Sequence, residues 1–437
     1  MFEKYFELRE NGTNLKTEIL AGITVFLAMG YIVIVNPIIL GQAGLPQSGV
    51  ATATILITVF SSILMGVYAK NPIAVAPGMG LNAYFTFSVV KGMNVTPEVA
   101  LGTVFWSGVF FVILSASNIR SKIVEAIPKQ LRYAVSCGIG LFIAVIGFVN
   151  AGFVVASPAT LITQGALNAK TITFMLGLFL TSFFLVKKIP GGTLLGIITT
   201  TVLAIPIGRF WGSEVIVSSF SKIISMPDFS LFLKLELLES LKLVYVPVIF
   251  SFLFTDMFDS LSTFMGVAEA GNLLDKEGNP RNLKKSLLAD AISTLISGIL
   301  GSSSGTSYIE SAAGVNAGGR TGLVAVVAGL CFVPLLFFSP LLSLVPSLAT
   351  APVLVLVGVF MMVPITKINW YSLDDAVPAF LAAILIPMTY SITNGIVWGM
   401  LSFLVLKVLS KKYHEVNLGL VGVCILSVIA LYLGHFH

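Results

Sequence analysis

The sequence predicts an all-α, polytopic membrane protein with fourteen transmembrane segments in two inverted repeats of seven. Three observations predict this class. Hydrophobic residues make up 56% of the 437 residues and charged residues 10%, with a mean hydropathy of +0.98, which excludes a soluble globular protein. Apolar runs number seven in each half, and the basic residues lie mostly on one side of them. Since each half has an odd number of spans, the second half is inverted relative to the first.

Apolar runs bounded by Gly, Pro and charged residues mark the spans, because a helix needs about 20 apolar residues to cross a bilayer. The first repeat, 17–208, has expected spans at 17–36, 50–69, 76–90, 97–117, 129–149, 170–186 and 192–208. The second repeat, 243–410, has expected spans at 243–267, 284–300, 305–316, 321–342, 350–364, 376–392 and 394–410.

Three further segments flank these repeats. Residues 1–16 form an N-terminal segment with no cleavable signal pattern, so the first span is expected to remain as a signal anchor. Residues 209–242 form a long loop with an amphipathic segment around 229–241. In the C-terminal tail, 411–437, the apolar stretch 416–432 is expected to be an interfacial helix, with a fifteenth span as the alternative.

The basic residues orient the chain. If the N-terminus is cytoplasmic and fourteen spans alternate, six of the 25 Lys and Arg residues fall outside, which leaves 19 inside. The outer six are Lys91, Lys170, Arg209, Lys222, Lys234 and Lys242. This excess of basic residues in cytoplasmic loops predicts a multi-pass plasma-membrane protein with both termini in the cytoplasm. It also explains the pI near 9.0 without nucleic-acid binding.

Two short, glycine-interrupted segments occupy corresponding places in the two halves, at 76–84 in the third span and 301–314 in the tenth. A weak repeat supports the correspondence, because Pro128, Gly140 and Phe142 recur 218 residues later (346 − 128) as Pro346, Gly358 and Phe360. At membrane depth, non-helical backbone survives only inside protein or beside a water-filled cavity. Interrupted segments at matching places in inverted halves predict the substrate site of a transporter.

Acidic residues gather at these segments. Asp256 and Asp259 are three residues apart in the eighth span, so a helix places them on one face. Glu310 lies within the interrupted tenth span. Ionisable residues inside a membrane mark functional sites by default, and a carboxyl that gains and loses a proton suits a proton-coupled carrier. The alternatives are that Asp259 or Asp256 caps a helix or pairs with a cytoplasmic base, and that Glu310 is exposed at the cytoplasmic lip.

Neighbouring residues complete the predicted site. Asn82 offers a donor and an acceptor, although an amide that bridges two helices is an equal alternative. Phe85 and Tyr308 could stack on a flat ring, with packing as the alternative for each. Asp290 in the ninth span is expected to pair with Lys284 or Lys285, with a second relay position as the alternative. No nucleotide-binding motif, metal-ligand cluster or resident cofactor is predicted.

Several long segments resemble the AzgA-like purine permeases of the nucleobase–ascorbate transporter group. The resemblance covers nearly the whole chain in order, and its most specific segments are 15–32, 76–85, 256–267, 272–275, 301–314, 318–323 and 376–395. Members of that family carry adenine, guanine or hypoxanthine inward with protons. The resemblance implies a core domain of spans 1–4 and 8–11, a gate domain of spans 5–7 and 12–14, and short strands in spans 3 and 10.

Carried over by position, the resemblance places the acids of the site on Asp256 and Glu310, with Asp259 close to the first, and its polar residue on Asn82. Ser307 and Tyr308 lie in the matching context of Glu310. We therefore predict that Asp256, Glu310, Asn82, Tyr308, Ser307 and Phe85 bind a purine. We further predict that Asp256, Asp259 or Glu310 takes the coupled proton.

The leading prediction is thus a purine–proton symporter that is not an enzyme. Within the same fold, transport of uracil, xanthine or an anion and coupling to Na⁺ are the alternatives, although acids beside the site would repel an anion. An intramembrane hydrolase is the remote alternative, but it would need acids brought together from separate helices. The sequence leaves open which purine is preferred and whether the protein is a homodimer.

Overall fold

The computed structural model describes residues 2–117, 128–211, 223–275, 278–342, 344–416, 420–422 and 424. Most of the predicted interfacial helix at 416–432 lies outside these residues. So do four of the basic residues used to orient the chain, Arg120, Lys122, Lys222 and Lys276.

Helices or strands occupy each predicted span of the first repeat. After α1 (Phe2–Tyr5) come α2 (Leu15–Met29) with α3 (Ile32–Gly41), α4 (Gln47–Leu64) with η1 (Met65–Ala69), β1 (Val75–Pro77) with α5 (Met79–Ala83) and η2 (Tyr84–Lys91), α6 (Pro97–Ala116), α8 (Lys129–Asn150), α9 (Ala169–Val186) and α10 (Gly192–Trp211). A hairpin of β2 (Val154–Ser157) and β3 (Leu161–Gln164) separates α8 from α9.

The second repeat follows the same plan. Its elements are α11 (Val246–Gly271), α12 (Leu283–Leu300), β4 (Gly305–Ser307) with α13 (Ser311–Asn316), α14 (Leu323–Phe332) with η5 (Val333–Phe337) and α15 (Ser339–Leu342), α16 (Ser347–Met361) with η6 (Val363–Lys367), α17 (Leu373–Thr389) and α18 (Ile392–Leu409). In the described residues, eight helices are long and apolar enough to cross a membrane alone. The other spans are short, interrupted or rich in Ser and Thr. The predicted strands in spans 3 and 10 are confirmed.

Local sequence explains where these helices begin. Pro128 and Pro346 both lie at the N-cap of their helices, α8 and α16, as the predicted repeat requires. Asn168 and Thr171 form a capping box at the start of α9, and Thr96 caps α6 with Pro97 in its first turn.

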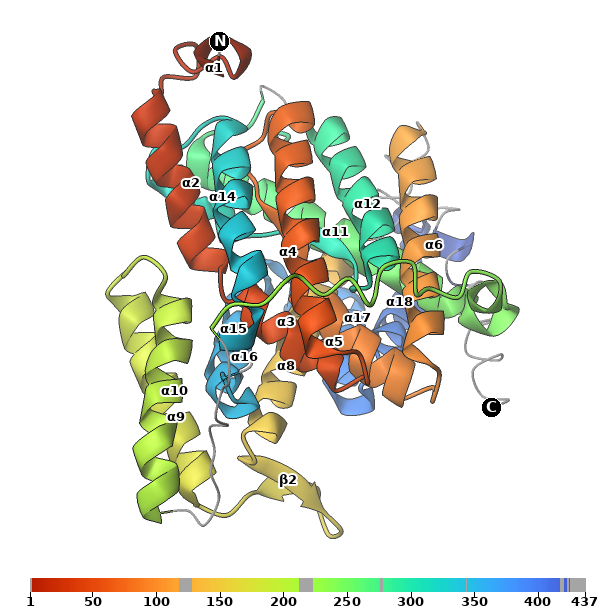
Figure 1. Cartoon of the computed structure of the whole chain (residues 1–437). Coiled ribbons are helices and arrows are strands. Elements are labelled where there is room, and N and C mark those ends of the chain that lie inside the picture. Colours follow the sequence, from red (N-terminus) through yellow and green to blue (C-terminus); the bar gives the residue numbers. More distant parts are fainter. Residues whose placement is uncertain are drawn as a thin grey trace.

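The helices pack in two groups. In the strand group, which contains β1 and β4, spans 1–4 pack with spans 8–11, for example α6 on α12 and α2 on α14. In the hairpin group, which contains β2 and β3, spans 5–7 pack with spans 12–14, for example α8 on α16 and α8 on α17. Figure 1 shows α9 and α10 below α2, at the edge of the molecule.

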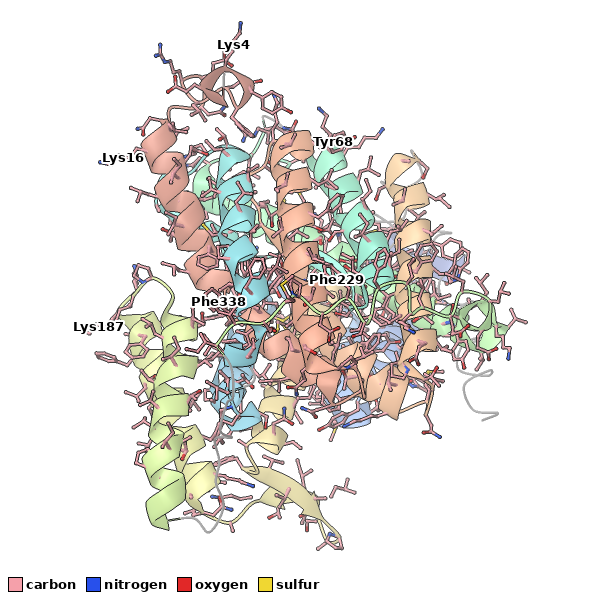
Figure 2. All side chains as sticks on the ribbon, viewed as in Figure 1. Lys4, Lys16, Tyr68, Lys187, Phe229 and Phe338 are labelled. Carbon is pink, nitrogen blue, oxygen red and sulfur yellow. The ribbon has the colours of Figure 1, made fainter. Side chains whose placement is uncertain are left out.

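The two groups are offset along the helix axes. Because successive spans run in opposite directions, α2 and α10, the first and seventh spans, begin at the same face of the protein. We call this face the N-terminal face. Yet Thr193, at the beginning of α10, donates a hydrogen bond of 3.1 Å to the carbonyl of Ala28. Ala28 lies 13 residues (28 − 15) into α2, or about 20 Å at 1.5 Å per residue. In Figure 2, Lys187 accordingly lies well below Lys16 and Tyr68.

A crossing segment, residues 223–242, runs over the opposite face of the strand group (Figure 1). Its backbone donates to the carbonyls of Phe337, Ile299 and Glu98 at 3.0, 2.9 and 3.0 Å. Ser48 donates to Asp228 at 2.6 Å, which holds the pKa of that carboxyl below its usual range. The stretch 229–241, predicted to be amphipathic, forms turns and the 3₁₀ turn Glu239–Leu241. The segment ties the ends of spans 2, 4, 9 and 11 together.

The repeat-related glycines meet at the centre of the hairpin group. A Cβ added at Gly140 would lie 2.8 Å from the carbonyl oxygen of Gly358, and one added at Gly358 would lie 2.5 Å from that of Gly140. Their reciprocal contact is what an inverted pair of spans produces. The third identity differs in environment, because Phe142 is buried and Phe360 is exposed.

We predict that Gly358→Ala lowers the melting temperature of the purified protein in detergent. The added methyl group meets backbone that cannot move aside, and such overpacking costs on the order of 1–3 kcal/mol. The control is Gly266→Ala, whose added Cβ would meet only the flexible end of Ile309, at 2.8 Å. Equal melting temperatures for the two variants would contradict the prediction.

Candidate functional site

The two interrupted spans cross at the centre of the strand group and pair as a short antiparallel sheet. Val75 lies opposite Ser307, Ala76 opposite Thr306 and Pro77 opposite Gly305. The pairing satisfies backbone groups that lipid could not satisfy. Gly305 is required for this approach, because an added Cβ would lie 2.1 Å from the Ser293 hydroxyl.

Tyr308 holds the crossing from one side. Its backbone N–H donates to Ala74 at 3.0 Å, and its hydroxyl donates to the carbonyl of Pro77 at 2.5 Å. The side chain is 5% exposed. Tyr308 therefore fastens β1 to β4, and in this conformation its ring is not free to stack on a ligand.

Behind the sheet, Asp256 of α11 and Asp290 of α12 are two buried carboxyl groups that lie near each other. The Thr294 hydroxyl lies within hydrogen-bond distance of one oxygen of Asp256 and of the carbonyl of Gly305. Among the described residues, neither acid has a basic partner. Two adjacent carboxylates without a cation repel each other, so the pair is suited to holding a proton.

Hydroxyl groups surround Asp290. Ser260 donates to one of its oxygens, and Ser307 donates to the other at 2.9 Å. The Ser260 hydroxyl also lies 2.8 Å from that of Thr306 in β4. The predicted site residue Ser307 thus links the strand to Asp290.

The expectation that Asp290 pairs with Lys284 or Lys285 is wrong. Residues five or six apart on a helix do not face each other, and Asp290 points into the strand group instead. That spacing was the signal in the sequence that could have identified Asp290 as a site residue.

Asp259 and Glu310 form a second acidic pair, which is half-buried. The Tyr31 hydroxyl donates to Glu310 at 2.6 Å, while Asp259 has no hydrogen-bond partner in the described part of the chain. Three of the predicted acids therefore gather at the crossing. Asp256 lies behind the sheet, and Asp259 and Glu310 lie on its more open side.

Asn82 and Phe85 lie inside the packed strand group and not on the surface of an open site. Both are fully buried. Ser303 donates to the side-chain oxygen of Asn82, so this amide bridges the two interrupted spans. A similar bridge joins Asn36 of α3 to Thr54 at 2.7 Å and to Ser302 at 3.0 Å. Sequence reasoning missed Tyr31 and Asn36, because nothing local connects them with residues more than 250 positions away.

Four buried polar atoms near the crossing have no hydrogen-bond partner among the described residues. They are Asp256 Oδ1, Thr255 Oγ1, Ser304 Oγ and Asn36 Oδ1. An unsatisfied buried polar group costs about 1–3 kcal/mol, so these atoms are positions where a bound polar molecule or ion would gain most. Asp256 Oδ1 is the strongest acceptor of the four.

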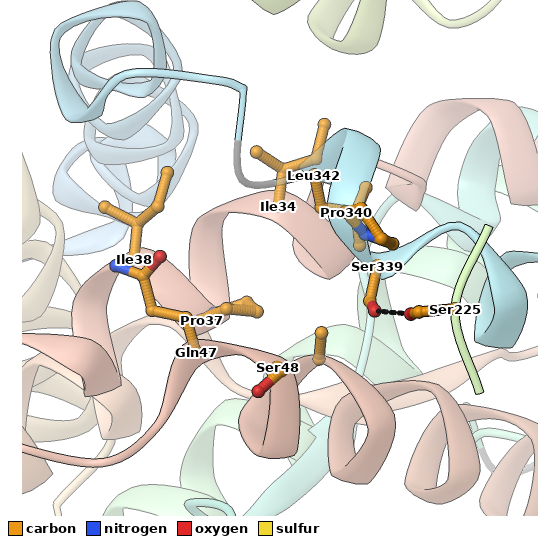
Figure 3. Close-up of a pocket in the computed structure, with 10 residues that line it drawn as sticks. Ile34, Pro37, Ile38, Gln47, Ser48, Ser225, Ser339, Pro340 and Leu342 are labelled. Carbon is orange, nitrogen blue, oxygen red and sulfur yellow. Dashed lines mark hydrogen bonds between the residues drawn. The ribbon is translucent and has the colours of Figure 1, made fainter. Parts of the chain in front are cut away.

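A cavity formed by described residues lies away from the crossing. It has a volume of about 200 Å³ and is lined by Ile34, Ile38, Gln47, Ser48 and Leu342, beside a hydrogen bond of 2.9 Å between Ser225 and Ser339 (Figure 3). None of the predicted site residues lines it. It contains no charged side chain, so we assign it no role in the chemistry of the acids.

We predict that Tyr308→Phe lowers the free energy of unfolding by about 0.5–1.5 kcal/mol, the net worth of one hydrogen bond, and loosens the strand crossing. Thermal unfolding with hydrogen exchange over 74–78 and 304–308 would measure both effects. Tyr413→Phe is the matched control, because Tyr413 is 59% exposed. Unchanged exchange at the strands in Tyr308→Phe would contradict the assignment.

Comparison with known proteins places this site in a family context. A family model described as "Permease family" matches residues 16–398. The adenine permease AdeP of Escherichia coli K12 is 39% identical over 434 residues, covering 99% of this chain and 96% of that protein. The guanine/hypoxanthine permease PbuO of Bacillus subtilis 168 is 38% identical over 436 residues, covering 98% and 100%.

Solved structures support the fold. The transmembrane domain of the cyanobacterial bicarbonate transporter BicA matches with a TM-score of 0.64 at 15% identity, over 88% of this chain and 97% of that one. The transporter SLC26A9 matches with a TM-score of 0.63 at 11% identity, over 91% of this chain and 66% of that one. Both matches confirm the fourteen-span inverted-repeat fold and, at this identity, the fold alone. The sequence matches confirm the resemblance to AzgA-like permeases: the chain belongs to the Permease family and is a multi-pass membrane permease, not an enzyme.

Proposed function

We propose that this permease imports purine nucleobases by proton symport. The relatives named for adenine and for guanine and hypoxanthine support nucleobase transport. The observation that carries the proposal is the strand crossing, where four acids of the second repeat meet polar side chains of the first repeat beside unsatisfied polar atoms. A purine is a flat, apolar ring with N–H donors and ring acceptors along its edge, which such a site can match.

Substrate contact is assigned first to Asp256 and Glu310. A carboxylate accepts two neighbouring N–H groups side by side, and among the described residues Asp256 Oδ1 has no partner that a ligand would displace. Glu310 already accepts from Tyr31, which fixes its orientation. Ser307, Asn82, Tyr308 and Phe85 then act mainly by holding the two spans and the floor of the site in place.

Proton coupling is assigned to the acids as a set. Asp256 and Asp290 are buried together without a cation, so one proton between them removes their repulsion. Asp259 and Glu310 repeat this arrangement on the more open side. Proton release would restore a negative charge beside the purine edge and would thus link substrate occupancy to protonation.

Movement is assigned to the two packing groups. We propose that the strand group is the core domain, that the hairpin group is the gate domain and that the N-terminal face is cytoplasmic. The offset at Thr193 and Ala28 supports sliding of one group along the other. In this proposal the core has moved toward the cytoplasm, where Asp259 and Glu310 are half-exposed.

An anion carrier is the second candidate, because structures with the same fold include a bicarbonate transporter. Four carboxyl groups around the crossing oppose it, since each ionised acid would repel an anion. Selectivity for a neutral base with N–H donors fits those acids better.

The test is uptake of radiolabelled adenine, guanine and hypoxanthine into proteoliposomes, with and without an inward pH gradient. We expect gradient-driven accumulation of at least one purine, with competition ranking the three. A sodium gradient across matched vesicles distinguishes the coupling ion. Accumulation of none of them under either gradient would overturn the proposal.

The variants Asp256→Asn and Glu310→Gln should lose uptake. Loss of a charged hydrogen-bond partner costs about 1.5–3 kcal/mol, or about 10- to 150-fold in binding. Asp290→Asn should lose accumulation under a pH gradient more than it loses exchange of purine across the membrane. Glu269→Gln, an exposed acid on the same helix α11, is the control and should transport normally.

A further inference from the structure

We propose that Thr393 acts as a latch between the two packing groups. It belongs to the hairpin group and forms hydrogen bonds with two spans of the strand group, which keeps the transporter closed at the face opposite the N-terminal face. The inference rests on the proposed alternating movement of these groups. It assigns a function to a side chain that lies outside the acidic site.

Thr393, on α18, contacts two of the spans that carry the predicted site, the third and the eighth. Its hydroxyl lies 2.9 Å from that of Tyr84 and 2.7 Å from that of Ser251. Tyr84 follows Asn82 in the third span, and Ser251 lies on α11, five residues before Asp256 (256 − 251). Tyr84 and Ser251 are 2% and 1% exposed, so water does not compete for these bonds.

The turn between α17 and α18 reinforces the contact. Tyr390 adopts a left-handed conformation with φ of 51°, and its carbonyl accepts a hydrogen bond from Ser88. Its ring packs edge-on against Phe142 at 5.3 Å and against Phe87 at 6.5 Å. The Ser391 side chain caps α18 by accepting from Asn394 at 3.3 Å. A short, capped turn therefore presents Thr393 in a fixed position.

Polar contacts between the groups are concentrated at this turn. In the described residues, side chains join the two groups through Tyr84–Thr393, Ser251–Thr393, Ser88–Tyr390 and Thr193–Ala28. Three of these four meet at the α17–α18 turn.

Nearer the N-terminal face the boundary is lined mainly by apolar side chains. A cavity of about 10 Å³ separates Phe258 of α11 from Leu131 and Met400 of the hairpin group. Arg132 lines that cavity, and its Nε has no partner among the described residues. In the described residues, hydrogen bonds of side chains thus join the groups mainly at the α17–α18 turn, and none joins them at this cavity.

This asymmetry gives the latch its role. To expose the acids to the opposite face, the strand group must break both hydrogen bonds of Thr393. Their loss should favour the state open to that face by about 5- to 150-fold, the range that couplings of this size produce.

The experiment uses the full chain in membrane vesicles, with Cys137, Cys331 and Cys424 replaced by alanine and Phe87→Cys as reporter. A membrane-impermeant thiol reagent is added from the opposite face. Thr393→Val, which keeps the side-chain shape, should raise the labelling rate by about 5- to 150-fold. Thr393→Ser keeps a hydroxyl and should restore slow labelling.

The matched control is Thr389→Val at the other side of the same turn. Among the described residues, the Thr389 hydroxyl bonds only its own helix, at Leu385, at 2.7 Å, and it is exposed. Equal labelling of Thr393→Val and Thr389→Val would overturn the latch, and so would fast labelling of Thr393→Ser. Labelling requires no substrate. Faster labelling of Thr393→Val without any purine uptake would therefore reject the proposed function and support the latch. Purine uptake with unchanged labelling would support the proposed function and reject the latch.

Discussion

The structure depends on one constraint: backbone groups at membrane depth must find partners within the protein. Spans 3 and 10 break their helices, and each break exposes carbonyls and N–H groups that lipid cannot bind. Pairing β1 with β4 satisfies them, and it forces the two repeats to cross at one place. The acids, the buried hydroxyl groups and the serine-rich stretch before β4 all gather at that crossing. If either span were a continuous helix, it would have no unpaired backbone groups, and nothing would bring the acids, the hydroxyl groups and the serine-rich stretch together.

The acids of the site lie at two depths, on the two sides of the strand crossing. Asp256 and Asp290 lie behind the sheet among hydroxyl groups, whereas Asp259 and Glu310 lie on its open side with Tyr31. The hydroxyl groups can donate to a carboxylate or accept from a protonated acid. Such a shell allows the charge at the centre to change without leaving a donor unpaired, as a carrier that binds and releases an ion requires.

Charge and hydrogen bonding hold each packing group together at its ends. At the N-terminal face Arg281 bonds Asn11 at 2.5 Å and the Arg320 carbonyl at 2.7 Å, which fastens the N-terminal segment to the strand group. In the hairpin group Lys407, 1% exposed, pairs with Asp374, Asp375 and Glu415 at 2.7–2.8 Å. A buried cation with several carboxylate partners resists separation. Rigid groups with few polar contacts between them favour movement as two bodies.

The sequence by itself determined the number of spans, the inverted halves and the two interrupted segments, because hydropathy, proline and glycine act locally on the chain. It also placed Asp256, Asp259 and Glu310 at membrane depth. It did not determine that Asp290 faces Ser260 and Ser307, that Tyr31 bonds Glu310 or that Thr393 joins Tyr84 to Ser251. Those contacts link residues up to 309 positions apart. Only the tertiary structure decided them, because the pairing of the strands and the offset of the two groups set which side chains meet.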